Sequence, residues 1–296
     1  MNFVQKGIYY YADCFENLDS SILPGELQIS NRMSNEAVLI RLLSGTLKIK
    51  YTTGEIVQNT NYSISGTSPN GSFNKNIIKD FFSFDHFRKV ERKNIDTYLK
   101  ANRKNYFIHS EMLSELTSAI VWLNSSPIES FVHIYRTLEF MSYSFPMIYA
   151  SKSMDYRGSY EHLKKFMNGD SDGELKFFKT FLKELFKNNI LFDYEFEIGF
   201  LNGDEDLIRQ ELGRIIPSNI SYTFEDYTMK IRFANIIDLV ITLRNRYFHM
   251  LLGKGTDNFY DINYDKRKLF EAVNPVFINW LTMIYKEIVV YSIGIV

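Results

Sequence analysis

Long segments with the periodicity of amphipathic helices fill the chain from about Asp85 onward. Apolar residues recur there every three to four positions, and clusters of Asn, Gly, Ser and Pro separate the segments. In a chain of 296 residues, this pattern predicts a mostly α fold built on a helical bundle of about 200 residues. The expected helices are Ser110–Asn124, Pro127–Ala150, Ser159–Met167, Glu174–Asn188, Asp204–Arg214, Tyr227–Leu252 and Lys266–Ile295.

The N-terminal part of the chain has a different sequence pattern. The stretch "EAVLIRLLSGTLKIKYTTGEIVQ", Glu36 to Gln58, joins β-branched and alternating residues through Ser-Gly and Thr-Gly, which predicts short strands and turns. The stretch "GTSPNGSFN", Gly66 to Asn74, has the composition of a loop. We therefore divide the chain into a small N-terminal α+β domain of unknown role, residues 1–87, and a helical domain, residues 88–296.

Charge and composition restrict the classes of function. The formal net charge of −1 argues against a basic nucleic-acid coat, so any contact with RNA must be a local patch. The aromatic share of 16%, mostly Phe and Tyr, favours helices packed through phenyl rings. The single cysteine, Cys14, excludes an internal disulfide and a multi-cysteine zinc site.

No segment reads as a secretion signal or a membrane span. The start "MNFVQKGIYYYADCF" lacks a charged region followed by an apolar one. The apolar run Val276 to Val296 is interrupted by Lys286 and Glu287, whereas a span needs about 20 apolar residues. We expect a buried bundle helix here, and a soluble, cytoplasmic protein with no membrane contact.

Wound as a helix, the segment from Ile231 to Leu252, which includes most of "IDLVITLRNRYFHMLLG" (Ile237 to Gly253), carries an apolar stripe and an opposite polar line. Arg244 lies near the apolar edge, but its long stem can carry the guanidinium toward the polar line. The stripe consists of Phe233, Ile236, Ile237, Val240, Leu243, Tyr247 and Leu251. The line consists of Asp238, Thr242, Asn245 and His249.

A solvated helix face is the simplest interpretation of such a line. However, Asn245 and His249 stand one turn apart, so an amide and an imidazole can address the same small ligand. Arg244 adds a planar, permanently charged fork that suits phosphate. Together the three supply an acid or base near neutrality, a hydrogen-bonding orienter and a charge stabiliser, as phosphoryl chemistry requires.

Two stretches resemble the HEPN family. "LRNRYFH", Leu243 to His249, is similar to the HEPN signature of an Arg, a following polar residue such as Asn, and a His after four to six positions. "IYRTLEFMSYSFP", Ile134 to Pro146, resembles the Tyr-Arg-x-x-x-Glu-like helix of many bacterial HEPN proteins. The resemblance covers roughly Ile108 to Val296.

The resemblance implies a HEPN-like helical domain that dimerises and cleaves RNA without metal in a shared cleft. Many relatives are toxins or effectors of anti-phage and abortive-infection systems, and others are inactive scaffolds or nucleotide binders. In this chain His249 would act as base or acid, Arg244 as charge stabiliser and Asn245 as orienter. One His cannot easily serve both ends of an in-line displacement, and two from a two-fold dimer can.

The acidic clusters do not favour a metal site. "GDSDGELK", Gly169 to Lys176, is too closely spaced for a nuclease core and lacks a complete calcium loop, so we expect a solvated loop. "DYEFEIG", Asp193 to Gly199, alternates acids with apolar residues like a half-exposed strand. We therefore expect neither metal nor cofactor.

Several residues have a structural and a functional interpretation. Arg136 and Glu139 are spaced for an i, i+3 ion pair, and this structural interpretation is the one we prefer. In the functional interpretation, Glu139 holds Arg244 in position. Tyr247 belongs to the core stripe and supports the site. His133 and His162 fit surface or packing roles.

The basic stretch from His86 to Lys104 interleaves cations with aromatic residues and can grip an RNA backbone. A solvated helix face is the more common structure for such a run. The RNA-binding candidates are Arg88, Lys89, Arg92, Lys93, Arg103, Lys104 and Arg246.

The sequence favours a metal-independent endoribonuclease that uses the ribose 2′-hydroxyl as nucleophile at a composite dimer site. Its expected partners are RNA, a second copy of the chain, and an antitoxin or ATPase protein. A non-catalytic HEPN-type interaction subunit of a defence system is the alternative. An unrelated helical protein with a chance motif is the third possibility.

Overall fold

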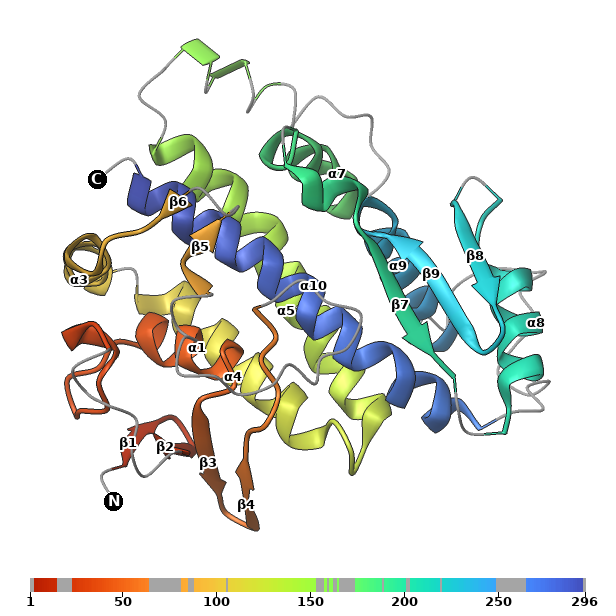
Figure 1. The fold of residues 1–296 in the computed structure, drawn as a ribbon, viewed down its shortest axis with the longest axis horizontal. Helices are drawn as coiled ribbons and strands as arrows, with labels where there is room; N and C mark the ends of the chain where they lie inside the picture. The colour runs from red at the N-terminus through yellow and green to blue at the C-terminus, as the bar shows by residue number, and fades with distance from the viewer. Residues whose placement is uncertain are drawn as a thin grey trace.

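The computed structural model confirms a mostly α fold, in which long helices form the body of the molecule (Figure 1). Two small antiparallel sheets lie at opposite ends of this body, and a short strand pair lies beside it. The residues that the structure describes are 3–14, 23–63, 81–84, 88–104, 106–152, 157–158, 160–161, 164, 174–187, 189–200, 203–218, 220–248 and 265–294.

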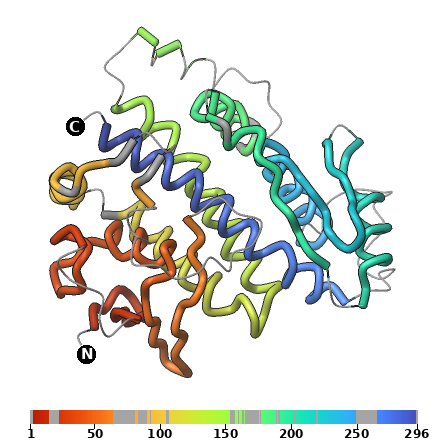
Figure 2. Tube along the Cα trace, in the orientation of Figure 1, coloured from red at the N-terminus to blue at the C-terminus, as the bar shows by residue number. Residues whose placement is uncertain are grey.

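Three long helices make the centre of the bundle. α4, Tyr106–Trp122, and α5, Pro127–Lys152, form a helical hairpin, and α10, Lys266–Gly294, runs alongside α5 (Figure 2). Aromatic rings fill the space between them, since Phe131 of α5 contacts Phe270 and Phe277 of α10 at centroid distances of 4.8 and 6.1 Å. The Phe-rich composition therefore serves helix packing, as expected.

α10 is long and apolar enough to cross a membrane, but 83% of its most apolar window is buried inside the protein. Trp280, at its middle, is fully enclosed and donates its indole N–H to the Phe233 carbonyl at 3.1 Å. Lys286 is also buried and donates to the Ser63 carbonyl at 3.3 Å. α10 is therefore a helix of the protein core.

The N-terminal unit is a four-stranded antiparallel sheet with one buried helix. The strands are β1 (Val4–Lys6), β2 (Tyr9–Asp13), β3 (Leu47–Tyr51) and β4 (Gly54–Val57), in the order β1-β2-β3-β4. Between β2 and β3 lie the 3-10 helix η1 (Gly25–Leu27) and α1 (Asn35–Leu43). Ser34 caps α1 by accepting a hydrogen bond from the Ala37 amide at 3.1 Å.

α1 corrects one expectation from the sequence. Its apolar run was expected to contribute strands, but the structure gives a helix followed by the β3–β4 hairpin. Every residue of α1 is buried, so the run has no polar face to reveal a helical period. Periodicity alone does not distinguish a fully buried helix from a buried strand.

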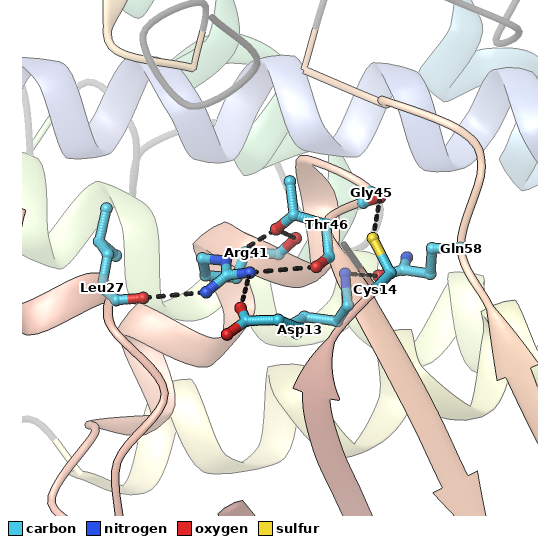
Figure 3. A network of polar contacts seen from close by, with 8 residues as sticks. Asp13, Cys14, Leu27, Arg41, Gly45, Thr46 and Gln58 are labelled. Carbon is cyan, nitrogen blue, oxygen red and sulfur yellow. Dashed lines mark hydrogen bonds and ion pairs between the residues drawn. The ribbon is translucent and has the colours of Figure 1, made fainter. Parts of the chain in front are cut away.

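The N-terminal unit is anchored by Arg41 of α1, whose side chain is fully buried (Figure 3). Its guanidinium donates to Asp13 Oδ1 at 2.5 Å and to the Leu27 carbonyl at 3.1 Å. It also donates to the carbonyl and hydroxyl oxygens of Thr46, at 3.0 and 2.8 Å. One buried cation therefore joins β2, η1, α1 and the turn before β3.

The N-terminal unit packs directly on the helical body. The hydroxyls of Tyr9 and Tyr11 lie 2.8 Å from those of Ser118 and Thr117 of α4. Asn279 of α10 donates to the Tyr62 carbonyl at 2.6 Å. One hydrophobic cluster includes core residues from both parts of the chain, so contacts cross the boundary placed at residue 87.

A second small sheet lies near the other end of the bundle. Its strands are β7 (Glu195–Gly199), β8 (Tyr222–Glu225) and β9 (Thr228–Arg232), in the order β7-β9-β8. β7 alternates buried and accessible residues, as its sequence predicts. The helices of this region are α7 (Glu174–Leu185), η3 (Ile190–Asp193), α8 (Glu205–Ile215) and α9 (Phe233–Phe248).

β9 is the second correction. The segment from Tyr227 was expected to begin one long helix, but Thr228–Arg232 form a strand that pairs with both β7 and β8. The helix then begins at Phe233, directly after the strand. Most of the helix expected at Ser159–Met167 lies outside the described residues.

The basic stretch after residue 86 is only partly helical. β5 (Ser83–Phe84) pairs with β6 (Arg88–Lys89), and α3 (Arg92–Ala101) with η2 (Asn102–Lys104) follows. α3 packs against η1 and α10. The stretch therefore joins the two parts of the molecule.

Candidate functional site

α9 has the buried and polar sides that its sequence predicts. On the polar side Asp238, Thr242 and Asn245 are partly enclosed, so this line is not a fully solvated helix face. His249 and Leu251 lie outside the described residues. The buried stripe, with each side chain at most 3% exposed, consists of Phe233, Ile236, Ile237, Val240, Leu243 and Tyr247.

Arg244 is held by a neighbour on its own helix and by an aromatic ring from α5. Its Nη1 donates a hydrogen bond to Asn245 Oδ1 at 3.1 Å. Its Cζ lies 5.0 Å from the ring centroid of Tyr135, within the range of a cation–π interaction. The guanidinium is thus drawn around the helix toward the polar line, as its long stem allows.

Asp238 ties the start of the polar line to a neighbouring helix. Its Oδ2 accepts a hydrogen bond from Lys179 Nζ of α7 at 2.5 Å, and both side chains are partly buried. Since the two residues are distant in the sequence, helix periodicity does not predict this pair. α7 covers the N-terminal half of the line, and Arg244 and Asn245 mark its C-terminal half.

Of the two α5 residues expected to support the site, Arg136 has a partner on another helix. Arg136 pairs with Glu115 of α4 at 3.3 Å. Glu115 also lies 2.7 Å from His133 Nδ1, which gives His133 a packing role, as expected. The α5 side chain found against Arg244 is Tyr135, and Glu139 stands one helical turn further along the same face.

Tyr135 is the site residue that the sequence reasoning missed. It directly precedes Arg136 in the stretch "IYRTLEF", so the signal was present in the motif. Its contact with Arg244 nevertheless depends on how α5 packs beside α9, which no local pattern reveals. Phe248 of α9 stacks on Phe131 of α5 at 5.5 Å with an interplanar angle of 18°, and this contact fixes the same pair of helices.

Arg246 faces the side of α9 away from Arg244. Its Nε donates to Glu211 Oε1 of α8 at 3.1 Å, and its side chain is 11% exposed. Glu211 also accepts from Arg214 at 2.9 Å. Arg246 was expected among the RNA-binding candidates, whereas the structure encloses most of it between α8 and α9.

Tyr247 is a core residue at the same end of α9. It is 3% exposed and meets Phe270 of α10 edge-on at 5.4 Å. Lys266 Nζ lies 5.8 Å from its ring centroid. Burial, and secondarily the charge of Arg246, lower the pKa of the Lys266 ammonium. Any support that Tyr247 gives the site therefore acts through the packing of α9 on α10.

The cations of the basic stretch whose burial the structure describes are Lys93, Lys100 and Arg103, and all three are exposed. Arg103 pairs with Glu26 at 2.5 Å, so its charge is partly balanced at the surface. The side chains of Arg88, Lys89, Arg92 and Lys104 are outside the described set.

In the part of the chain that the structure describes, His, Cys, Asp and Glu side chains do not gather in threes as a metal site requires. The loop within Gly169 to Lys176 lies largely outside that part. A guanidinium and an amide, joined on one side of a helix, can bind phosphate oxygens and stabilise negative charge on them.

No family model, curated protein or solved structure matches this chain.

Proposed function

We propose that this chain is a HEPN-type endoribonuclease that cleaves RNA without metal and acts in the cytoplasm as a homodimer. The observation that supports this function best is the hydrogen bond from Arg244 to Asn245, together with the cation–π contact between the Arg244 guanidinium and the Tyr135 ring. This contact gives the predicted charge stabiliser and orienter a fixed relation on the polar side of α9. His249 follows one turn after Asn245 in the sequence.

The proposed reaction uses the nucleophile that RNA carries. The imidazole of His249 from one subunit removes the proton of a ribose 2′-hydroxyl, whose oxygen then bonds to the adjacent phosphorus. The bond from phosphorus to the 5′-oxygen breaks, and that oxygen takes a proton from the imidazolium of the other subunit. Arg244 stabilises the developing phosphorane charge. The products are a 2′,3′-cyclic phosphate and a 5′-hydroxyl.

The need for two imidazoles gives a reason for two subunits, because each chain carries one such His. α5 offers a surface for this contact. Tyr143 is 54% exposed and Met147 is 52% exposed, and they follow Tyr135 and Glu139 at successive four-residue steps along one face. Exposed large apolar side chains in a row are typical of an interaction surface.

The test is cleavage of a labelled RNA in the presence of EDTA. Arg244→Ala and His249→Ala should each abolish cleavage, because one removes the charge stabiliser and the other the acid and base. Arg209→Ala and His133→Ala are matched controls outside the site, and both should cleave like the wild type. A substrate with 2′-deoxyribose at the cut position should stay intact.

Loss of activity on adding EDTA, or full activity of either site variant, would contradict the proposal. Wild-type protein that is folded and dimeric but cleaves no RNA favours the alternative, a HEPN-type interaction subunit that uses the α5 surface to dock on a partner such as an ATPase. We place the biology among toxins and anti-phage or abortive-infection effectors, so expression of the wild type should arrest growth and His249→Ala should not.

A further inference from the structure

A buried polar cluster lies where α1 meets α3 and α4, apart from the proposed nuclease site. Glu36 of α1 is 2% exposed. One of its carboxyl oxygens, Oε1, accepts a hydrogen bond from the Tyr98 hydroxyl at 2.5 Å. The other, Oε2, lies 3.5 Å from Nε2 of His109, which is itself 6% exposed. Glu36 and His109 therefore form an acid and base pair inside the seam between the N-terminal sheet unit and the helical bundle.

Two further helices, α10 and α5, complete the surroundings of this pair. The Tyr285 ring of α10 meets His109 edge-on at 6.2 Å. A small cavity beside the cluster is lined by Tyr98, His109 and Tyr285, and also by Lys152 of α5. It offers about 10 Å³ to the centre of a water molecule, which is room for about one water. The cavity is too small for a metabolite. The chemistry to consider in this cluster is therefore the gain and loss of protons by Glu36 and His109.

The groups that face the pair are two phenols, Tyr98 and Tyr285, and the ammonium of Lys152. Burial raises the pKa values of Tyr98 and Tyr285 well above the ordinary value of a phenol, so both hydroxyls stay protonated. Lys152 contributes a positive charge that favours ionised Glu36. Among the described residues, Nδ1 of His109, Oε2 of Glu36 and the Tyr285 hydroxyl have no hydrogen-bond partner.

Burial shifts the pKa values of Glu36 and His109 in opposite directions. It raises the pKa of the Glu36 carboxyl from 4.5 to about 7, against the smaller opposing effects of the Tyr98 hydrogen bond and the Lys152 charge. It lowers the pKa of the His109 imidazole from 6.5 to about 4. Both groups are thus held in their neutral forms, because desolvation disfavours charge on either one.

We propose that Glu36 and His109 are a compensating pair. As pH falls, the contribution of Glu36 to stability strengthens while that of His109 weakens, so that the seam between the N-terminal unit and the bundle keeps its stability in mild acid. The sign of each contribution follows from proton binding. Between pH 4.5 and about 7 folding binds a proton at Glu36, so this residue's contribution weakens as pH rises. Between pH 4 and about 6.5 folding releases a proton at His109, so its contribution strengthens as pH rises.

The window in which both effects operate runs from about pH 4.5 to 6.5, and there the two slopes oppose each other. Removing one partner should therefore reveal the slope of the other. In Glu36→Gln the unfolding constant, relative to the wild type, should fall by up to about tenfold for each pH unit of increase. In His109→Gln it should rise by up to about tenfold for each unit.

The experiment is urea unfolding of the full chain at several pH values across this window. Glu36→Gln and His109→Gln should diverge from the wild type with opposite slopes, and the double variant should run parallel to it. Glu129→Gln, at an exposed site on α5, is the matched control and should also run parallel. Single variants that both follow the wild-type pH profile would overturn the proposal.

A second measurement does not depend on whether the variants fold. The ¹⁵N chemical shifts of the His109 imidazole in the wild type report its charge directly. A neutral ring at about pH 5.5, below the ordinary pKa of 6.5, supports the pair as proposed. An imidazolium at that pH would show that Glu36 and His109 form an ion pair instead, and would overturn it.

Discussion

At the scale of single residues, Arg41 shows how the N-terminal unit stabilises a buried charge. Its side chain is fully enclosed, and its only ionic partner among the described residues is Asp13, whose side chain is 38% exposed. Carbonyl oxygens of Leu27 and Thr46 take up the remaining donors. Because a planar fork on α1 meets acceptors from three other segments, the residue specifies how these segments lie together, which an apolar side chain cannot do.

Arg41→Met should lower the free energy of unfolding by about 3–5 kcal/mol, as the breaking of a buried charged network does. The substitution leaves acceptors of Leu27 and Thr46 without their donors and leaves Asp13 without its cation. Urea unfolding measures the change. Arg32→Met, at an exposed position, is the matched control and should change stability little. Equal stability of the two variants would show that apolar packing replaces the network.

At the scale of secondary-structure elements, the sequence predicts those helices that have one buried and one polar face. The long helices α4, α5 and α10 begin and end within a few residues of their expected bounds. α1 and β9 were assigned wrongly for opposite reasons. α1 is buried on all sides, so its sequence shows no helical period. β9 is a strand because it pairs with β7 and β8, and the local sequence pattern does not reveal this pairing.

The candidate site shows the same division between local and non-local information. Arg244 and Asn245 are neighbours in the sequence, and their spacing relative to the polar line was readable from the helix period. Tyr135 and Lys179 reach α9 from other helices. Their contacts depend on how helices pack, and similar polar and aromatic residues elsewhere in the chain give the same local signal.

The contact between α5 and α9 leads to a prediction about Tyr135. Tyr135→Leu removes the aromatic face beneath Arg244, and a cation–π contact contributes about 0.5–2 kcal/mol. If the guanidinium must be held in place for catalysis, the single-turnover cleavage rate should fall by about twofold to thirtyfold. Tyr135→Phe keeps the ring and should retain most of the rate. An equal loss in both variants would assign the effect to the hydroxyl and contradict the cation–π role.

At the scale of the whole molecule, the N-terminal unit and the helical body share one hydrophobic cluster. The Tyr9 and Tyr11 hydroxyls, the Asn279 amide and the Glu36 carboxyl all reach across the seam between them. A unit bound in this way is part of the support for α4 and α10, and through α10 it supports α9. The dimer proposed above would use the outer face of the bundle, where α5 exposes Tyr143 and Met147.

The last prediction concerns this surface and rests on the proposed dimer. A double substitution, Tyr143→Glu with Met147→Glu, places two charges on the exposed row of α5 and should convert the dimer to a monomer, because like charges would face each other across a two-fold contact. Sedimentation equilibrium measures the mass, and RNA cleavage should be lost in parallel. Tyr227→Glu, at a site that is 56% exposed on the β8–β9 turn, is the matched control and should remain dimeric and active. A wild-type chain that cleaves RNA as a monomer would contradict the requirement for two imidazoles, since one subunit would then supply both proton transfers.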